Sequence, residues 1–286
     1  MTLFRKVSQQ RGFALIVVLW VLTLLGVIAA ALLRDSGTET KVAYNLRENA
    51  KAEALAEAGV QRAILGLLDS DDASVWRADR TPYTFSLADG VAIIRLQSEA
   101  GKIDVNSASD ELITGLFVAV GMSEGKATEL VAAMADFRDS DSIRHAGGAE
   151  DADYEAVDAI LGSKDAPFER VEELMQVRGI TPEMYERISA AVTVYGRGQL
   201  DVTTAPDLVL QVLRNVMPER LNRMIAARQA SAVKLSRPRT VTVTVEVHTS
   251  GGGRFLREAI IQRTAGPEPY RVLAWRQRWS APASAH

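Results

Sequence analysis

Residues 13–33 form one uncharged apolar run of 21 residues, FALIVVLWVLTLLGVIAAALL. As a helix rising ~1.5 Å per residue, such a run reaches about 30 Å, the thickness of the hydrocarbon core of a bilayer. The apolar region of a cleaved secretory signal usually has only ~7 to 15 residues, so the length favours a membrane-spanning helix. The alternative is a cleaved signal, because residues 29–31 are alanines, small residues of the kind that a signal peptidase accepts.

A short basic segment precedes this run. It contains Arg5, Lys6 and Arg11 and ends at Gly12. Basic residues beside a membrane helix tend to stay on the cytoplasmic side. We therefore predict that residues 34–286 lie on the opposite side of the membrane.

The junction of Arg11, Gly12 and Phe13 resembles the cleavage site of type IV prepilins and type II secretion pseudopilins. The resemblance implies a leader of residues 1–12, cut off after Gly12 by a prepilin peptidase, and N-methylation of the new first residue, Phe13. In most of these proteins the fifth mature residue is a glutamate. Here this position is Val17.

The missing glutamate at Val17 predicts a special place in a fibre. A carboxylate inside an apolar helix costs several kcal/mol unless it is paired, so it is retained where a neighbouring subunit's terminal amine neutralises it. A subunit without it has no such partner and suits the tip rather than the shaft.

Among pseudopilins, the K-type minor pseudopilin of type II secretion has this feature, and this chain resembles that family along nearly its full length. The resemblance implies a non-enzymatic protein of the cell inner membrane with its C-terminal body in the periplasm. Its partners would be the I-type and J-type minor pseudopilins, and its role would be to help initiate pseudopilus assembly and protein export.

Charge and composition exclude other classes. The chain has 33 Lys and Arg against 36 Asp and Glu, and its net charge of −3 falls to −6 once the leader with its three basic residues is removed. A net negative charge argues against binding of nucleic acid, which is itself negatively charged. The chain has no cysteine, so disulfides and thiolate chemistry are absent. No Ser-His-Asp order, phosphate loop or paired-carboxylate cleft indicates an enzyme.

Beyond the membrane segment the helix is expected to continue to about Leu68, because residues 34–68 contain no proline and favour helix. Val42, Leu46, Ala50 and Ala54 recur every four residues. We predict that this apolar stripe packs against a sheet.

Alternating patterns and turn signals predict a sheet divided between the two ends of the chain. The expected strands are residues 83–87, 91–96, 240–248, 254–263 and 270–279. The fold class is therefore α+β: a pilin-like long N-terminal helix with an antiparallel sheet, interrupted by a large inserted, mostly α-helical domain. The expected parts are 34–105 and 234–286 for the pilin-like domain and 106–233 for the insertion.

Two eight-residue sequence segments in this middle region are alike, and we call them the two alike phrases. Residues 101–108, GKIDVNSA, align with residues 198–205, GQLDVTTA, and helices are expected to begin near Ser109 and Pro206. Such phrases are typical of the edges of the helical domain in K-type pseudopilins.

The same region also resembles helix-hairpin-helix modules, with Gly121 and Gly179 between helices and Lys126 and Arg178 nearby. Glycines of this kind can bring backbone amides close to a phosphate. Acidic residues crowd both turns, however, which favours ordinary helix turns over DNA binding. These acids are Glu124, Glu129, Glu183 and Glu186.

The acidic segment 136–158 is a candidate calcium site, since Ca²⁺ takes about six to eight oxygen ligands. Composition alone favours a solvated loop, because the spacing is not that of an EF-hand. The resemblance to K-type pseudopilins, which carry a D-x-D and a Gly-Ala-Glu-Asp stretch, implies a structural calcium instead. The implied ligands are Asp139, Asp141, Glu150, Asp151 and Asp153.

His145 lies in the same loop, and an imidazole suits zinc or copper better than calcium. We expect it to be a surface residue without a zinc site. Two functional alternatives remain: a minor pilin of a type IV pilus, and a helix-hairpin-helix DNA receptor.

Overall fold

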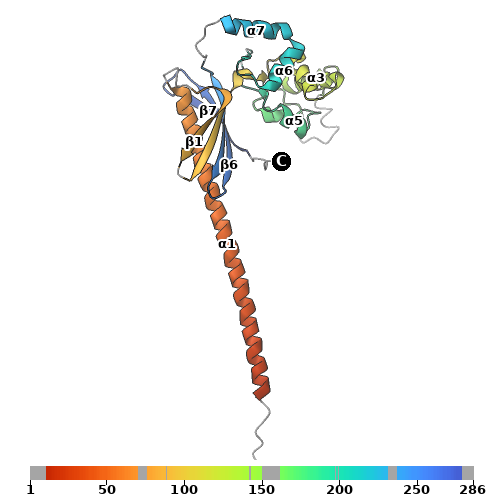
Figure 1. Cartoon of the computed structure of the whole chain (residues 1–286). Coiled ribbons are helices and arrows are strands. Elements are labelled where there is room, and N and C mark those ends of the chain that lie inside the picture. Colours follow the sequence, from red (N-terminus) through yellow and green to blue (C-terminus); the bar gives the residue numbers. More distant parts are fainter. Residues whose placement is uncertain are drawn as a thin grey trace, which may run out of the picture.

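The computed structural model describes residues 11–69, 76–87, 89–141, 143–149, 162–196, 198, 200–230 and 237–278. A single helix, α1 (Arg11–Leu68), runs 58 residues and extends far beyond the rest of the molecule (Figure 1). Its part from Phe13 to Ala30 has a mean hydropathy of 2.8 and none of it is buried. This segment is long and apolar enough to cross a membrane once, as a single-pass anchor.

The upper part of α1 lies against an antiparallel sheet. Its strands are β1 (Asp79–Leu87), β2 (Gly90–Ser98), β5 (Thr240–Thr249), β6 (Arg254–Arg263) and β7 (Tyr270–Arg278). Their order is β1-β2-β5-β6-β7, so a strand from the first half of the chain pairs with one from the last part. The predicted strands agree with these five within four residues at every end.

Period-2 alternation decides which face of the sheet meets α1. Val241, Val243, Val245 and Val247 are each 0% exposed and pack with α1, whereas the threonines between them face the opposite side. Gly59 of α1 permits close approach, because a Cβ there would lie 2.6 Å from a methyl group of Val245.

The prediction that the apolar stripe of α1 packs against the sheet is wrong. Val42 and Leu46 are 51% and 65% exposed, and Ala50 and Ala54 are exposed as well. Positions spaced by four residues drift ~40° around a helix at each step, so this stripe turns away from the sheet. The residues of α1 that pack on the sheet are instead Ala52, Leu55, Ala56, Val60, Ala63, Ile64 and Leu67.

Between β2 and β5 the chain forms a mostly helical region beside the end of the sheet farthest from the start of α1 (Figure 1). Its elements are η1 (Glu99–Gly101), β3 (Ile103–Asp104), α2 (Asp110–Ala119), α3 (Glu124–Arg138), η2 (Val171–Gln176), α5 (Pro182–Ile188), β4 (Val192–Thr193), α6 (Asp207–Val216) and α7 (Pro218–Ala230). The parallel pairing of β3 with β4 was not predicted. A second core fills this region, with Phe117, Phe137 and Leu174 among its fully buried members.

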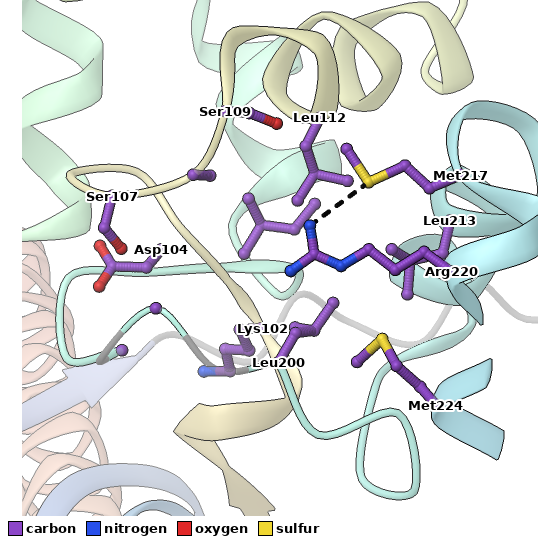
Figure 2. A pocket seen from close by; sticks show the side chains of 14 residues that line it. Lys102, Asp104, Ser107, Ser109, Leu112, Leu200, Leu213, Met217, Arg220 and Met224 are labelled. Carbon is purple, nitrogen blue, oxygen red and sulfur yellow. Dashed lines mark hydrogen bonds between the residues drawn. The ribbon is translucent and has the colours of Figure 1, made fainter. Parts of the chain in front are cut away.

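The two alike phrases adopt the same local turn. The Asp104 carboxylate accepts a hydrogen bond from the backbone N–H of Asn106 at 2.9 Å, and Asp201 does the same for Thr203 at 3.0 Å. Each turn leads into a helix, α2 or α6, as predicted, and the two phrases help to line a pocket beneath α7 (Figure 2).

One buried carboxylate joins the helical region to the sheet. Glu99 is 2% exposed and accepts hydrogen bonds from Thr193 of β4 and Thr242 of β5, and Lys102 Nζ lies 2.6 Å away. Arg276 of β7 adds an ion pair to Glu172 at 2.6 Å. These contacts set the position of the helical region on the polar face of the sheet.

Candidate functional site

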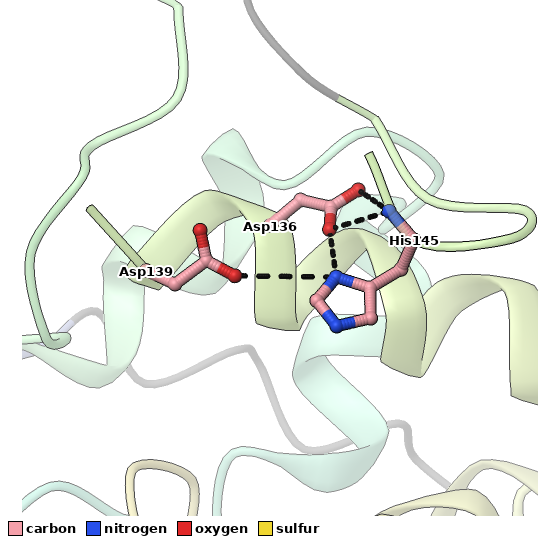
Figure 3. A group of neighbouring side chains, drawn as sticks. All are labelled: Asp136, Asp139 and His145. Atoms are coloured by element: carbon pink, nitrogen blue, oxygen red, sulfur yellow. Dashed lines mark hydrogen bonds and ion pairs between the residues drawn. The ribbon is translucent and has the colours of Figure 1, made fainter. Parts of the chain in front are cut away.

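The predicted acidic loop begins where α3 ends, and the described side chains of this part form a small cluster (Figure 3). Asp136 lies on the last turn of α3 and is completely buried. Asp139 caps the C-terminal end of the same helix, and His145 returns to it from the loop. One potential ligand atom from each of these three residues lies within 4.8 Å of the others.

Asp136 is bound mainly by His145. The backbone N–H of His145 donates to both carboxylate oxygens of Asp136, at 3.1 and 3.3 Å, and its imidazole Nδ1 contacts Oδ1. This hydrogen bond raises the pKa of His145 above its ordinary value, against the opposing effect of burial. The imidazole is 55% exposed, which confirms His145 as a surface residue.

Gly147 and Gly148 make this return possible. Gly147 has φ of +85°, a conformation that favours glycine. A Cβ on Gly148 would overlap the carboxylate of Asp136, and its N–H closes a turn on the His145 carbonyl at 2.9 Å. The loop therefore needs both glycines to lie against α3.

Asp139 has an oxygen that the described residues do not satisfy. Its Oδ1 is buried and has no hydrogen-bond partner among them, while its Oδ2 lies 3.9 Å from His145 Nδ1. Two carboxylates at a helix C-terminus also face the negative end of the helix dipole. A cation at Asp139 would neutralise this carboxylate, and carboxylate oxygens fit a hard, oxygen-binding cation, whereas the imidazole of His145 does not.

Only part of the predicted ligand set can be placed. Asp139 belongs to the cluster, and Asp141 lies on the exposed loop, where its Oδ1 accepts the N–H of Ile143 at 2.8 Å. Glu150, Asp151 and Asp153 lie outside the described residues. Sequence reasoning did not name Asp136 as a site residue, although an acid on the otherwise apolar face with Ala133 and Phe137 was a usable signal.

A second candidate surface runs along α1. The stripe of Leu46, Ala50 and Ala54 continues upward to Leu65, which is 65% exposed. Beside Ala54 lies a hollow of about 230 Å³, partly lined by Leu87 of β1, with a salt bridge between Lys51 and Asp89 at 3.2 Å on its rim. An apolar helix face with a polar edge is suited to packing against another helix.

The predicted processing positions lie at the start of α1, where its membrane part begins. Gly12 and Phe13 are in its first turn, and Phe13 and Val17 are 73% and 44% exposed. Exposed apolar side chains at these positions suit contact with lipid or with neighbouring helices.

The helix-hairpin-helix glycines occupy real turns. Gly121 and Gly179 have φ of +92° and +96°. Lys126 and Arg178 line one hollow of about 440 Å³, together with Glu129.

The sequence profile of a family described as "Type II secretion system (T2SS), protein K" matches residues 91–197. The chain is 25% identical over 298 residues to the type II secretion system protein K of Pectobacterium carotovorum subsp. carotovorum, covering 95% of this chain and 87% of that protein. It is 24% identical over 214 residues to a putative type II secretion system protein K of Escherichia coli K12. That alignment covers 68% of this chain and 65% of the relative, slightly less than two thirds of its length.

The fold is similar to that of a chain in the crystal structure of the GspK-GspI-GspJ complex from the type II secretion system of enterotoxigenic Escherichia coli. The TM-score is 0.56 at 15% sequence identity, and the match covers 86% of this chain and 99% of that chain. This likeness confirms the α+β, pilin-like fold class with its inserted helical domain.

Proposed function

We propose that the chain is a K-type minor pseudopilin of type II secretion, as the matched family model and the two protein K relatives support, and that it occupies the tip of the pseudopilus and helps to initiate its assembly. One observation carries this proposal. The helical region lies at the end of the sheet farthest from the membrane part of α1 (Figure 1). A subunit stacked above would collide with it, whereas subunits below can pack along α1.

The missing glutamate supports the same placement. Val17 cannot neutralise the terminal amine of a neighbouring subunit, so the chain does not need a subunit ahead of it. In this proposal a prepilin peptidase cuts after Gly12, Phe13 is N-methylated, and α1 holds the subunit in the inner membrane with its body in the periplasm. Mass spectrometry of the mature N-terminus tests the cut and the methyl group directly.

The proposed partners are the I-type and J-type minor pseudopilins. Their contact surface on this chain would include the exposed stripe of α1 around Leu46 and Ala54, because α1 continues there directly from the membrane. The structural relative was crystallised in a complex of GspK with GspI and GspJ, which supports partners of these two kinds.

Co-purification of the full chain with candidate I-type and J-type partners tests this assignment. Leu46→Glu places a charge on the stripe and is expected to abolish the ternary complex, while the matched Leu46→Met keeps it. If no ternary complex forms with the unaltered chain, and Val17→Glu leaves secretion intact, the tip assignment is wrong.

We also propose a structural calcium in the loop that follows α3, held by Asp139 and Asp141 together with Glu150, Asp151 and Asp153. The Oδ1 of Asp139, which has no hydrogen-bond partner among the described residues, supports it. When bound, the ion would supply positive charge at the end of α3 and tie the loop to the helical region. A ligand that binds only the folded state raises stability by about 2.7 kcal/mol at 100 times its Kd.

Metal content and thermal melting of the full chain, with and without a chelator, test the calcium site. We expect bound calcium, a fall in melting temperature on chelation, and loss of both effects in Asp139→Asn. Asp207→Asn, an exposed acid at the start of α6, is the matched control. An unchanged melt together with no bound calcium would end the proposal.

A DNA-receptor role has one observation in its favour, the shared hollow of Lys126 and Arg178. Glu129 lines the same hollow, and the exported body is acidic, so we propose no nucleic-acid partner. Salt-sensitive retention of the full chain on DNA would overturn this view. A type IV pilus role is tested by gene context, since secretion requires an outer-membrane secretin without retraction machinery.

A further inference from the structure

A pocket of about 210 Å³ is lined by residues of α2, α6, α7 and the two alike phrases (Figure 2), and none of them belongs to the loop after α3 or to the exposed stripe of α1. Its walls come from the two alike phrases, the start of α2, the end of α6 and the first turns of α7. A cavity of ~150 Å³ lined by apolar side chains is large enough to hold a benzene ring. This pocket therefore has room for one large apolar side chain.

The walls of the pocket combine polar groups with apolar, adaptable side chains. Leu112 comes from α2 and Leu200 from the second phrase. Met217 directly precedes α7, and Met224 lies within it. All four are only partly buried, so part of their apolar surface remains open to a ligand. Methionine side chains are flexible and can adjust to ligands of different shape.

One cation, the exposed Arg220, lies at the edge of this pocket. The guanidinium of Arg220 points toward Leu112 and Met217 in Figure 2, and among the described residues its one polar contact is Met217 Sδ at 4.0 Å. A thioether sulfur is only a weak acceptor and does not neutralise a positive charge. Arg220 is thus available for an anion.

The other charged groups of the pocket already have partners. Lys102 is paired with Glu99 at 2.6 Å, so it contributes mainly its aliphatic stem. The Asp104 carboxylate accepts the N–H of Asn106 and lies beside Ser107 in Figure 2, away from the guanidinium. The hydroxyl groups of Ser107 and Ser109 add donors at the edge.

α7 is held loosely over the pocket. Among its residues 218–227, whose burial is described, only Leu221 is buried. The helix packs chiefly against α6. A ligand can therefore enter between α7 and the walls without disrupting the buried core.

We infer that this pocket binds the C-terminal residue of another polypeptide, with a large apolar side chain between Leu200 and Met224 and its free carboxylate on Arg220. A guanidinium can bind a carboxylate through two parallel hydrogen bonds, which gives both strength and orientation. A C-terminal residue carries its side chain and its carboxylate on one Cα. This matches a pocket sized for one side chain beside a single cation.

Fluorescence anisotropy with the full chain in detergent micelles tests the inference. The probes are labelled short peptides that end in leucine with a free carboxylate, the same peptides with an amidated C-terminus, and peptides that end in serine. We expect the free-acid leucine peptide to bind at least about tenfold more tightly than either of the others. The amidated peptide loses one charge-assisted contact, and the serine peptide loses the apolar contact.

Variants separate the two parts of the site. Arg220→Gln is expected to weaken binding of the free-acid peptide about tenfold. The free-acid and amidated peptides should then bind alike, because the substitution and the amidation remove the same contact. Met224→Trp fills the pocket and is expected to abolish binding of all three peptides. Arg223→Gln, an exposed arginine on the same helix, is the matched control and should bind as the unaltered chain does.

Melting temperatures of all three variants establish that each is folded. Equal binding of acid and amide by the unaltered chain would overturn the inference, and so would full binding by Arg220→Gln or by Met224→Trp. This result is independent of the calcium site and of assembly along α1, because none of the residues tested belongs to either.

Discussion

The sheet with α1 and the helical region differ in how their cores are built. In the first, the central strand β5 alternates buried valines with polar residues, and one helix covers a whole face of the sheet. In the second, helices of 7 to 15 residues are joined by loops that polar side chains hold in place. Asn106, for example, exchanges two hydrogen bonds of 2.9 Å with the backbone of Phe168.

This difference indicates which substitutions should destabilise each unit. The sheet depends on the fit between two regular surfaces, so a change of shape on α1 should matter most. The helical region depends on a compact apolar centre and on a few polar anchors. The two units should also separate where Glu99 connects them.

The largest effect is expected in the centre of the helical region. Phe117→Ala removes a side chain that is 1% exposed and should cost about 3 to 5 kcal/mol. Chemical unfolding gives the free energy, and hydrogen exchange should show lost protection in α2, α3 and α6 while β5 and β6 keep theirs. Val118→Ala, at a neighbouring position that is 42% exposed, should change little. Equal loss of protection in the sheet would show that the two cores are one.

The connection between the units comes next. Glu99→Ala leaves Lys102, whose side chain is only 10% exposed, without its partner. Removing one member of a buried ion pair costs about 3 to 5 kcal/mol. We expect calorimetry to show two unfolding transitions in place of one, while Glu99→Gln, which keeps an acceptor, has a smaller effect. A single transition in Glu99→Ala would mean that other contacts suffice to join the units.

A change of shape on α1 should destabilise the sheet unit alone. Gly59→Leu forces side-chain atoms into Val245, and overpacking of this kind costs about 1 to 3 kcal/mol. Hydrogen exchange should show faster exchange in β5, with α2 and α3 unaffected. Gln61→Leu, on the exposed side of the same helix, should leave exchange in β5 unchanged, and faster exchange there would point to a general effect on α1.

The smallest effect concerns the lower end of the sheet. Hydrogen bonds from Lys51 and Thr249 hold the pKa of Glu48 below its ordinary value of 4.5. A carboxyl with a lowered folded pKa contributes stability that is present above pH 4.5 and is lost as the pH falls through the folded pKa. The melting temperature should therefore fall less on acidification in Glu48→Gln than in the unaltered chain. Parallel curves for the two would exclude a role for this carboxylate.

Much of the fold could be predicted from local patterns. The five strands and the continuous helix follow from periodicity. The alike phrases predicted helices that begin near Ser109 and Pro206, which are α2 and α6, and the structure adds equivalent turns at Asp104 and Asp201. The short strands β3 and β4 escaped prediction, because two residues carry no detectable period and their pairing joins positions far apart in the chain.

The candidate metal site could be predicted only in part. The D-x-D spacing and the resemblance together named Asp139 and Asp141. The pairing of Asp136 with His145 depends on how the loop returns to α3, and Gly147 and Gly148 fix that return through backbone geometry that composition does not show.

The sequence by itself determined the membrane helix, the divided sheet and the helical insertion, since each follows from spacing within one element. Only the tertiary structure decided which face of α1 is covered, which acid is buried, and that Arg220 lies beside Leu112 and Met217 at a pocket. Periodicity tells which residues share a face, but the partner of that face lies elsewhere in the chain. Its position depends on packing between distant segments.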